Sequence, residues 1–368
     1  MDMLECASWI GMAQSLFAGI LIGTKNNLNN SDRILSGWLF LMSIVFLSTS
    51  LYFRIYDNSL LSASFLLFNP VIFIYVRSLT NRKFSLRYIH LLHLLPFVIF
   101  EILAFNKHLP FSPLTILEPG PGFNYRIAFI TANLASWITY LPLSIIIVHR
   151  HRVALKNEVS NIESNETLGW IMFITIFYIF YCLTIFATGA TEIFSRFTSH
   201  TTQITNFAIL LALVYIISFY GLRQKELTKL FNPRMSLLAK TYKNSLLSDN
   251  QRGVIKEKII AYFRQSRPYM DPALNMDSLS EALNTPKYQL TEVLNRDLGK
   301  NFFQWVNHYR VEAVKKMLSD KSMPYSIEAT GYECGFSSKS SFYSFFKSET
   351  GMTPNEYRKK ALKTNSDD

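Results

Sequence analysis

Seven long apolar stretches follow one another in the first 222 residues, and they set the strongest limit on how this chain can fold. Each is close to the roughly 20 residues that an α-helix needs to cross a bilayer. Buried helices of a soluble core are the alternative, but seven such runs separated by short polar joints favour a transmembrane bundle. The predicted spans are Leu4–Ile22, Ile34–Phe53, Leu60–Val76, Tyr88–Phe105, Ile127–Val148, Trp170–Ala190 and Ile204–Leu222.

The charges in the loops predict the orientation of this bundle. With the N-terminus outside, the inner loops hold nine Lys and Arg residues and the outer loops four, as the positive-inside rule requires. An odd number of spans then puts the C-terminal part of the chain in the cytoplasm. We therefore expect a multi-pass membrane protein with a cytoplasmic C-terminal part.

Polar residues within the predicted spans are candidates for function, because such residues are costly in a membrane. His90, His93 and Glu101 share one face of the fourth span by helical spacing. They form either a ligand or proton site, or an ordinary set in which the histidines lie near the inner interface and Glu101 near the outer one. We predict no metal site, since no second pair of ligands is evident. The proline-rich outer loop Asn106–Arg126 is either a lid over a binding site or a plain connector.

The second part of the chain has a different composition. Overall, 49% of the residues are hydrophobic and 17% are charged, against about 25% charged in ordinary soluble domains. Residues 223–368 hold 24 of the 37 Lys and Arg and 16 of the 26 Asp and Glu, a net charge of +8. A basic excess suits a partner with a phosphate backbone. We predict three parts: a seven-helix sensor domain (1–222), a linker with an amphipathic helix at Asp249–Gln265 (223–268), and a DNA-binding domain (269–362).

The linker helix has a recognisable start and an apolar side. Ser248 followed by Gln251 has the spacing of a capping box, in which each side chain bonds the other residue's backbone N–H. The residues expected along one side of this helix are apolar or aromatic: Val254, Ile255, Ile259, Tyr262 and Phe263.

The stretch from Gly335 to Arg358 predicts a turn followed by a helix with one aromatic face. Gly335 takes a positive φ without steric cost, and Ser337 and Ser338 offer hydroxyl caps. Phe342, Phe345 and Phe346 recur at helical spacing and are expected to pack inward. Thr353 is the expected cap of a last helix that starts at Pro354. This is the pattern of a helix-turn-helix whose second helix meets a DNA groove. Its expected DNA-facing residues are Ser338, Lys339, Ser340, Tyr343, Ser344 and Lys347.

An upstream stretch predicts a partner helix-turn-helix. Thr285 is the expected cap and Pro286 the first residue of a recognition helix that ends near Leu298. Asn301 caps a joining helix, Phe302 to about Leu318, which spans roughly 25 Å and can hold two recognition helices about one DNA turn apart. Polar side chains of the types that bond base edges are left for the groove: Lys287, Tyr288, Gln289, Thr291, Glu292 and Asn295.

Together these motifs resemble the AraC family of bacterial transcription regulators, over about Tyr269 to Lys360. The G-F-S-S turn, the F-x-x-F-F-K run and the closing G-M-T-P-N-E-Y-R carry the resemblance. It implies two helix-turn-helix units joined by a helix, on which Arg310 either bridges the units or reaches a DNA phosphate. The chain departs from the family at Thr330 and Gly331, where an apolar residue followed by Ala is usual. Because Gly inside a helix costs up to about 1 kcal/mol against Ala, we expect the second unit to be somewhat softer.

The sequence therefore predicts an all-α protein, with a seven-helix transmembrane bundle and a double helix-turn-helix domain. Its predicted function is that of a regulator in the bacterial inner (cytoplasmic) membrane that senses an unknown ligand and binds double-stranded DNA as a homodimer. RNA polymerase is a further candidate partner, and lipid surrounds the bundle. A tether without sensing, or a transporter-like domain fused to a regulator, are the alternatives. We expect no enzyme activity and no cofactor.

Overall fold

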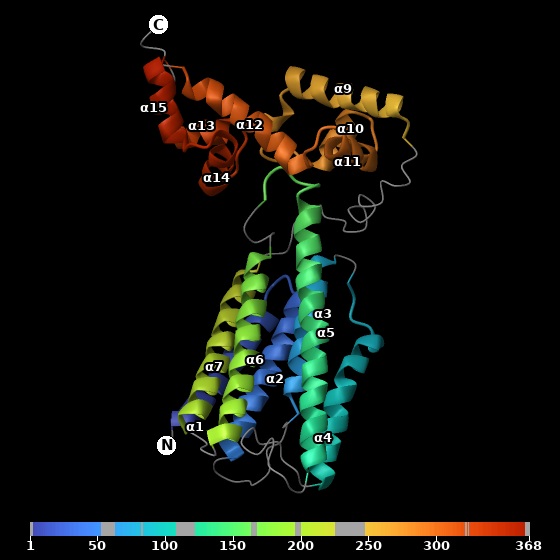
Figure 1. Cartoon of the computed structure of the whole chain (residues 1–368), viewed down its shortest axis with the longest axis vertical. Helices are drawn as coiled ribbons and strands as arrows, with labels where there is room; N and C mark the ends of the chain where they lie inside the picture. Colours follow the sequence, from blue (N-terminus) through green and yellow to red (C-terminus); the bar gives the residue numbers. More distant parts are fainter. Residues whose placement is uncertain are drawn as a thin grey trace. The chain divides into compact units, whose positions relative to one another are not determined.

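The computed structural model describes residues 3–52, 63–81, 84–107, 122–162, 168–195, 200–224, 247–320, 322 and 324–364, and every regular element in these ranges is a helix (Figure 1). The predicted all-α class is confirmed. The chain divides into two compact units: Met1–Arg150 with Leu168–Thr228, and His151–Thr167 with Lys229–Asp368. Most of the outer loop 106–126 and of the basic linker 223–243, for which the sequence makes predictions, lies outside the described residues.

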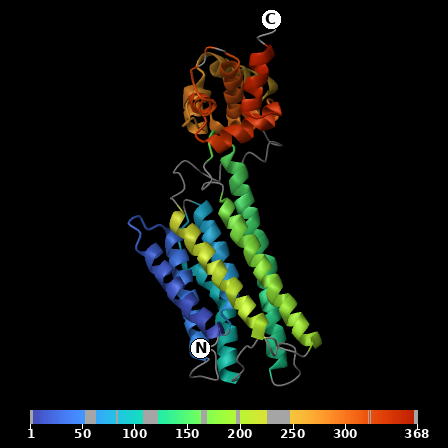
Figure 2. The ribbon, with the colours of Figure 1, turned by 90° about the vertical axis from the view of Figure 1, so that its left-hand side faces the viewer.

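The first unit is a bundle of long helices, which Figure 2 shows from a second direction. Helix α1 packs against α2 and α7, α3 against α2 and α4, and α6 against α7. The bounds are α1 Met3–Gly23, α2 Asn30–Tyr52, α3 Phe65–Thr80, η1 Tyr88–Leu94, α4 Leu95–Lys107, α5 Phe123–Leu155, α6 Gly169–Ser195 and α7 His200–Arg223.

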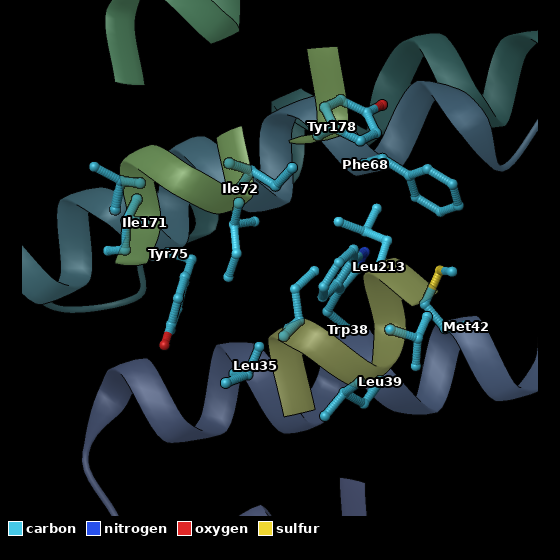
Figure 3. Packing of buried hydrophobic residues seen from close by; sticks show 14 of the residues in the cluster. Leu35, Trp38, Leu39, Met42, Phe68, Ile72, Tyr75, Ile171, Tyr178 and Leu213 are labelled. Atoms are coloured by element: carbon cyan, nitrogen blue, oxygen red, sulfur yellow. The ribbon is translucent and has the colours of Figure 1, made fainter. Parts of the chain in front are cut away.

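Apolar side chains lie both inside this bundle and on its outer surface. Trp38 and Phe68 are buried and meet edge to face, with ring centroids 6.3 Å apart (Figure 3). On the outside, Ile138 and Phe105 are each 74% exposed. A helix that is apolar all round is typical of a membrane span, because lipid covers the outward face. The buried cluster drawn in Figure 3 includes Leu35, Trp38, Leu39, Met42, Phe68, Ile72, Tyr75, Ile171, Tyr178 and Leu213.

Among the described residues, five helical stretches are long and apolar enough to cross a membrane, so the prediction of seven spans is wrong in number. The two predicted spans that fall short match the shorter apolar helices Phe65–Thr80 and Gly169–Ile185. Sixteen residues of α3 rise about 24 Å, less than the roughly 30 Å of a bilayer's hydrocarbon core. The five candidate spans are Glu5–Gly23, Asn30–Ser48, Tyr88–Asn106, Phe123–Leu155 and Ile204–Arg223.

The second unit is built from short helices around two separate apolar cores. One core lies among α9, α10, α11 and the start of α12, and the other among the end of α12, α14 and the turn before α14. Helix α12 contributes Val306 to the first core and Val314 to the second, so it joins the two. The bounds are α9 Asp249–Gln265, η4 Pro268–Met270, α10 Met276–Ala282, α11 Lys287–Arg296, α12 Phe302–Leu318, α13 Ile327–Glu333, α14 Lys339–Thr350 and α15 Pro354–Thr364.

Candidate nucleic-acid interface

The turn before α14 has the geometry that the sequence predicts. Gly335 has a φ of +92°, and the Ser338 hydroxyl accepts the Ser341 N–H at 3.2 Å. Phe342 and Phe346 are buried beneath this helix, while the predicted inward residue Phe345 is half-buried against Phe303 of α12. The aromatic face therefore fixes α14 on α12 and leaves its other face outward.

The outward face of α14 carries the residues that the sequence assigned to DNA. Ser338, Lys339, Ser340, Ser344 and Lys347 are exposed, and Tyr343 is half-buried. Lys339 forms an ion pair with Glu328 of α13, and its ammonium lies 5.7 Å from the centre of the Tyr343 ring. This surface is basic and rich in hydroxyl groups, which suits bonds to phosphates and base edges.

The first helix-turn-helix differs from the prediction at the start of its second helix. Helix α11 begins at Lys287, and Pro286 occupies the capping position with a ψ of 139°. The Thr285 hydroxyl bonds to the Leu283 carbonyl at 2.9 Å and caps nothing, so the predicted Thr285 cap is wrong. The turn is instead held by Asn284, whose φ is +44°. Asn accepts this left-handed conformation more readily than most residues.

Two of the side chains predicted to face the groove are buried. Thr291 is 9% exposed and bonds back to the Lys287 carbonyl, and Glu292 is 4% exposed. The physical reason is that α11 packs against α9, α10 and α12, which leaves only a narrow outward strip. Tyr288, at 55% exposed, and the half-buried Gln289 and Asn295 remain on that strip.

Lys287 lies at the N-terminal end of α11, but its charge is already paired. It forms ion pairs with Asp277 of α10 and, at 3.5 Å, with Glu158, and 17% of its side chain is exposed. Burial raises the pKa of the Glu158 carboxyl, while the nearby Lys287 ammonium opposes this rise. Glu158 was not singled out from the sequence, since it lies 129 residues from Lys287 and no local pattern marks it.

Arg310 is fully buried in the middle of α12, between the two cores. Its Nε donates to the Tyr269 carbonyl at 2.7 Å and its Nη2 to the Asp271 carbonyl at 2.9 Å, and further bonds reach Ser160 and Asn161. Burial lowers the pKa of the guanidinium to about 10, so it stays charged at neutral pH. Its guanidinium carbon also lies 5.8 Å from the centre of the Phe336 ring, so Arg310 contacts both the stretch before α10 and the turn before α14.

Thr330 and Gly331 have a local explanation in the packing of α13. The Thr330 hydroxyl bonds back to the Ser326 carbonyl at 3.0 Å. A Cβ added at Gly331 would lie 2.6 Å from the Phe342 ring, closer than real Cβ contacts. Glycine thus lets α13 approach α14 closely. Nearby, Cys334 is buried with its Sγ 3.4 Å from the Met317 sulfur, and burial raises the pKa of its thiol to about 12.

The three polar residues of the predicted membrane site each have a partner of their own. The stretch is a 3₁₀ helix, η1, that continues into α4, and His90 bonds the Arg87 backbone near its start. His93 bonds the Tyr140 hydroxyl at 2.7 Å, and Glu101 accepts the Ala63 N–H at 3.0 Å. Glu101 lies eight residues beyond His93, about 12 Å along a helix, so the structure brings the two histidines together but not the carboxylate. No group of three metal-ligating side chains occurs in the part of the chain that the structure describes.

Two helix pairs joined by one shared helix, with an exposed polar face on α14, define the second unit as a double helix-turn-helix. A family model described as a helix-turn-helix domain matches residues 279–360. Residues 279–360 form a helix-turn-helix domain of the AraC type.

Two comparisons with whole proteins cover a similar share of the chain. The uncharacterized HTH-type transcriptional regulator YijO of Escherichia coli K12 is 27% identical over 103 residues, which are 27% of this chain and 36% of that protein. The chain thus matches about a third of the length of this relative. A solved structure of a Listeria innocua protein of unknown function is 24% identical over 28% of this chain and 93% of the other, with a TM-score of 0.25.

Proposed function

We propose that the protein is a membrane-bound, sequence-specific DNA-binding transcription regulator. The observation that carries this proposal is the pair of second helices, α11 and α14, mounted on the shared helix α12. Helix α12 has 17 residues and rises about 25 Å, which suits two contacts in successive major grooves. The five apolar helices support insertion into the bacterial inner membrane. An outside N-terminus, a DNA-bound homodimer and contact with RNA polymerase belong to the same proposal.

The test is selection of randomised duplex DNA by the full chain in lipid nanodiscs, at two salt concentrations. We expect one motif with two half-sites about a helical turn apart. Salt-sensitive binding without sequence preference would mean that the basic surface holds phosphates only, and the regulator assignment would fall.

A charge-matched pair of variants separates local contacts from net charge. Lys347→Ala removes a cation from the outward face of α14, and Lys363→Ala removes one from the exposed end of α15. If Lys347 contacts a phosphate, Lys347→Ala should bind all DNA sequences more weakly, and the slope of log K against log salt concentration should be smaller by about one. Lys363→Ala should change little. Equal effects of the two variants would place no contact at Lys347.

For the membrane half we propose a sensing role, supported by the polar contacts of the half-buried His93 and Glu101 in the apolar stretch Tyr88–Asn106. Glu101→Gln and His93→Gln should change target-gene output under at least one growth condition. Unchanged output under all conditions would favour a simple tether. Uptake of solutes by vesicles that hold the protein would favour the transporter-like alternative.

A further inference from the structure

Residues 156–161, which directly follow α5, pack into the second unit; we refer to them as the docking segment. Val159 pairs with Asn275 in an antiparallel bridge. The flanking bonds run from the Met276 N–H to the Glu158 carbonyl at 2.9 Å and from the Ser160 N–H to the Leu274 carbonyl at 3.3 Å. The docking segment thus pairs through backbone hydrogen bonds with the residues at the start of α10, in the first helix-turn-helix.

The docking segment also bonds the shared helix α12. The Lys156 carbonyl accepts the Phe303 N–H at 3.0 Å, which satisfies a free donor in the first turn of that helix. The Ser160 carbonyl accepts from Asn307 and from Arg310, both at 3.0 Å, and the Ser160 hydroxyl accepts from Arg310 at 3.1 Å. Ser160 is fully buried, so its contacts are made away from water.

Asn161 connects the docking segment to the second helix-turn-helix by hydrogen bonds. Its Nδ2 donates to the Gly335 carbonyl at 3.0 Å and to the Pro272 carbonyl at 2.7 Å, and its Oδ1 accepts the Ser337 N–H at 3.4 Å. Together with the ion pair of Glu158 and Lys287, these bonds place the docking segment at the N-terminal ends of both α11 and α14.

The docking segment, drawn in green in Figure 1, lies on the opposite side of the second unit from α9. The N-terminal part of a recognition helix is the part that enters a DNA groove. If both helices enter successive major grooves, a segment held between these ends lies in the path of the DNA backbone. Its buried Glu158 also adds a negative charge there and pairs a lysine that could bind phosphate.

We propose that residues 156–161 are an autoinhibitory segment, which competes with DNA for the surface at the N-terminal ends of α11 and α14. This inference rests on the proposed DNA-binding function. Release of the docking segment removes Glu158 from Lys287, which keeps its ion pair with Asp277, and frees the Ser337 N–H. DNA shifts the balance toward release because it binds only that state. Because the docking segment continues directly from α5, a change in α5 can alter the same balance.

A reversible cross-link tests the competition. Val159 and Asn275 lie opposite each other in the antiparallel bridge, and the backbone hydrogen bonds are made by the residues on either side of them. In such a pair the two Cα atoms are about 4.5 Å apart, which is within reach of a disulfide. The full chain with Val159→Cys and Asn275→Cys should form this disulfide readily in nanodiscs, and duplex DNA should slow its formation. The oxidised protein should bind DNA at least about tenfold more weakly than the reduced protein, and dithiothreitol should restore binding. The two single variants are the controls.

A neutral substitution provides the opposite test. Asn161→Ala removes four hydrogen bonds of the docking segment without changing the charge, so DNA binding should tighten about tenfold. Gln265→Ala, which removes an exposed neutral amide at the end of α9, is the matched control and should bind as the unchanged protein does.

These experiments distinguish a failure of autoinhibition from a failure of sequence-specific DNA binding. Equal DNA binding by the oxidised and reduced protein, or a pair that does not oxidise, overturns autoinhibition even if a DNA motif is selected. If DNA slows the cross-link but no sequence is preferred, the competition stands and sequence-specific regulation fails.

Discussion

Replacing glycine by alanine should stabilise the second unit at one helical position and destabilise it at another. At a solvent-exposed position inside a helix, Ala makes the helix more stable than Gly does, by about 1 kcal/mol. Gly253 lies inside α9 with nothing within 4 Å of an added Cβ, so Gly253→Ala should stabilise by roughly 0.5–1 kcal/mol. At Gly331 the added Cβ would lie 2.6, 2.8 and 3.1 Å from three atoms of the Phe342 ring. Overpacking of this kind costs about 1–3 kcal/mol, so Gly331→Ala should destabilise by up to about 2 kcal/mol net.

Hydrogen exchange of the full chain in nanodiscs, read by mass spectrometry, measures both changes locally. Amides of α13 and α14 should exchange faster in Gly331→Ala, by up to about thirtyfold, and amides of α9 more slowly in Gly253→Ala. Adding Phe342→Leu, which makes room beside the new methyl group, should recover part of the loss. If the amides of α13 and α14 exchanged more slowly in Gly331→Ala, the reasoning would be refuted. Helix propensity, and not the clash with Phe342, would then determine the stability at that position.

Three further predictions concern the turn, the buried arginine and pH. Gly335→Ala should destabilise the second unit by roughly 3 kcal/mol or more and abolish DNA binding, since φ is +92° and a Cβ would lie 2.3 Å from the Tyr269 carbonyl oxygen; thermal unfolding and a binding titration check this. Arg310→Lys should cost about 2–4 kcal/mol in the same unfolding assay, because one ammonium cannot replace the planar set of donors. Because burial raises the pKa of Glu158, the docked state takes up a proton more readily; acidification toward its ordinary pKa near 4.5 should strengthen docking and weaken DNA binding, and Glu158→Gln should remove that dependence.

Helices α9, α12 and α15 begin with the capping residues that the sequence predicts. Ser248 and Gln251 form the predicted capping box of α9, and Asn301 caps α12 at the predicted residue. Thr353 caps α15 and exchanges bonds with Glu356. These features involve residues three apart, so the local sequence contains all the information that they need.

Predictions that depended on what packs around a helix were less accurate. The spacing along α11 could not show that three other helices surround it, so Thr291 and Glu292 were wrongly placed outside. Val254 of α9 was expected on the same side as Ile255, Ile259 and Phe263, but it is 57% exposed while those three are buried. Likewise, the cost assigned to Gly331 ignored Phe342, which lies on another helix.

The sequence by itself determined the helical class, the turn at Gly335 and the aromatic face of α14, because positive φ, capping and helical spacing act over a few residues. The tertiary structure alone decided the burial of Arg310 and the position of the docking segment. Arg310 meets Ser160 across 150 residues of sequence. Such a pair leaves no periodic pattern, and a polar residue's burial depends on which distant groups satisfy its hydrogen bonds.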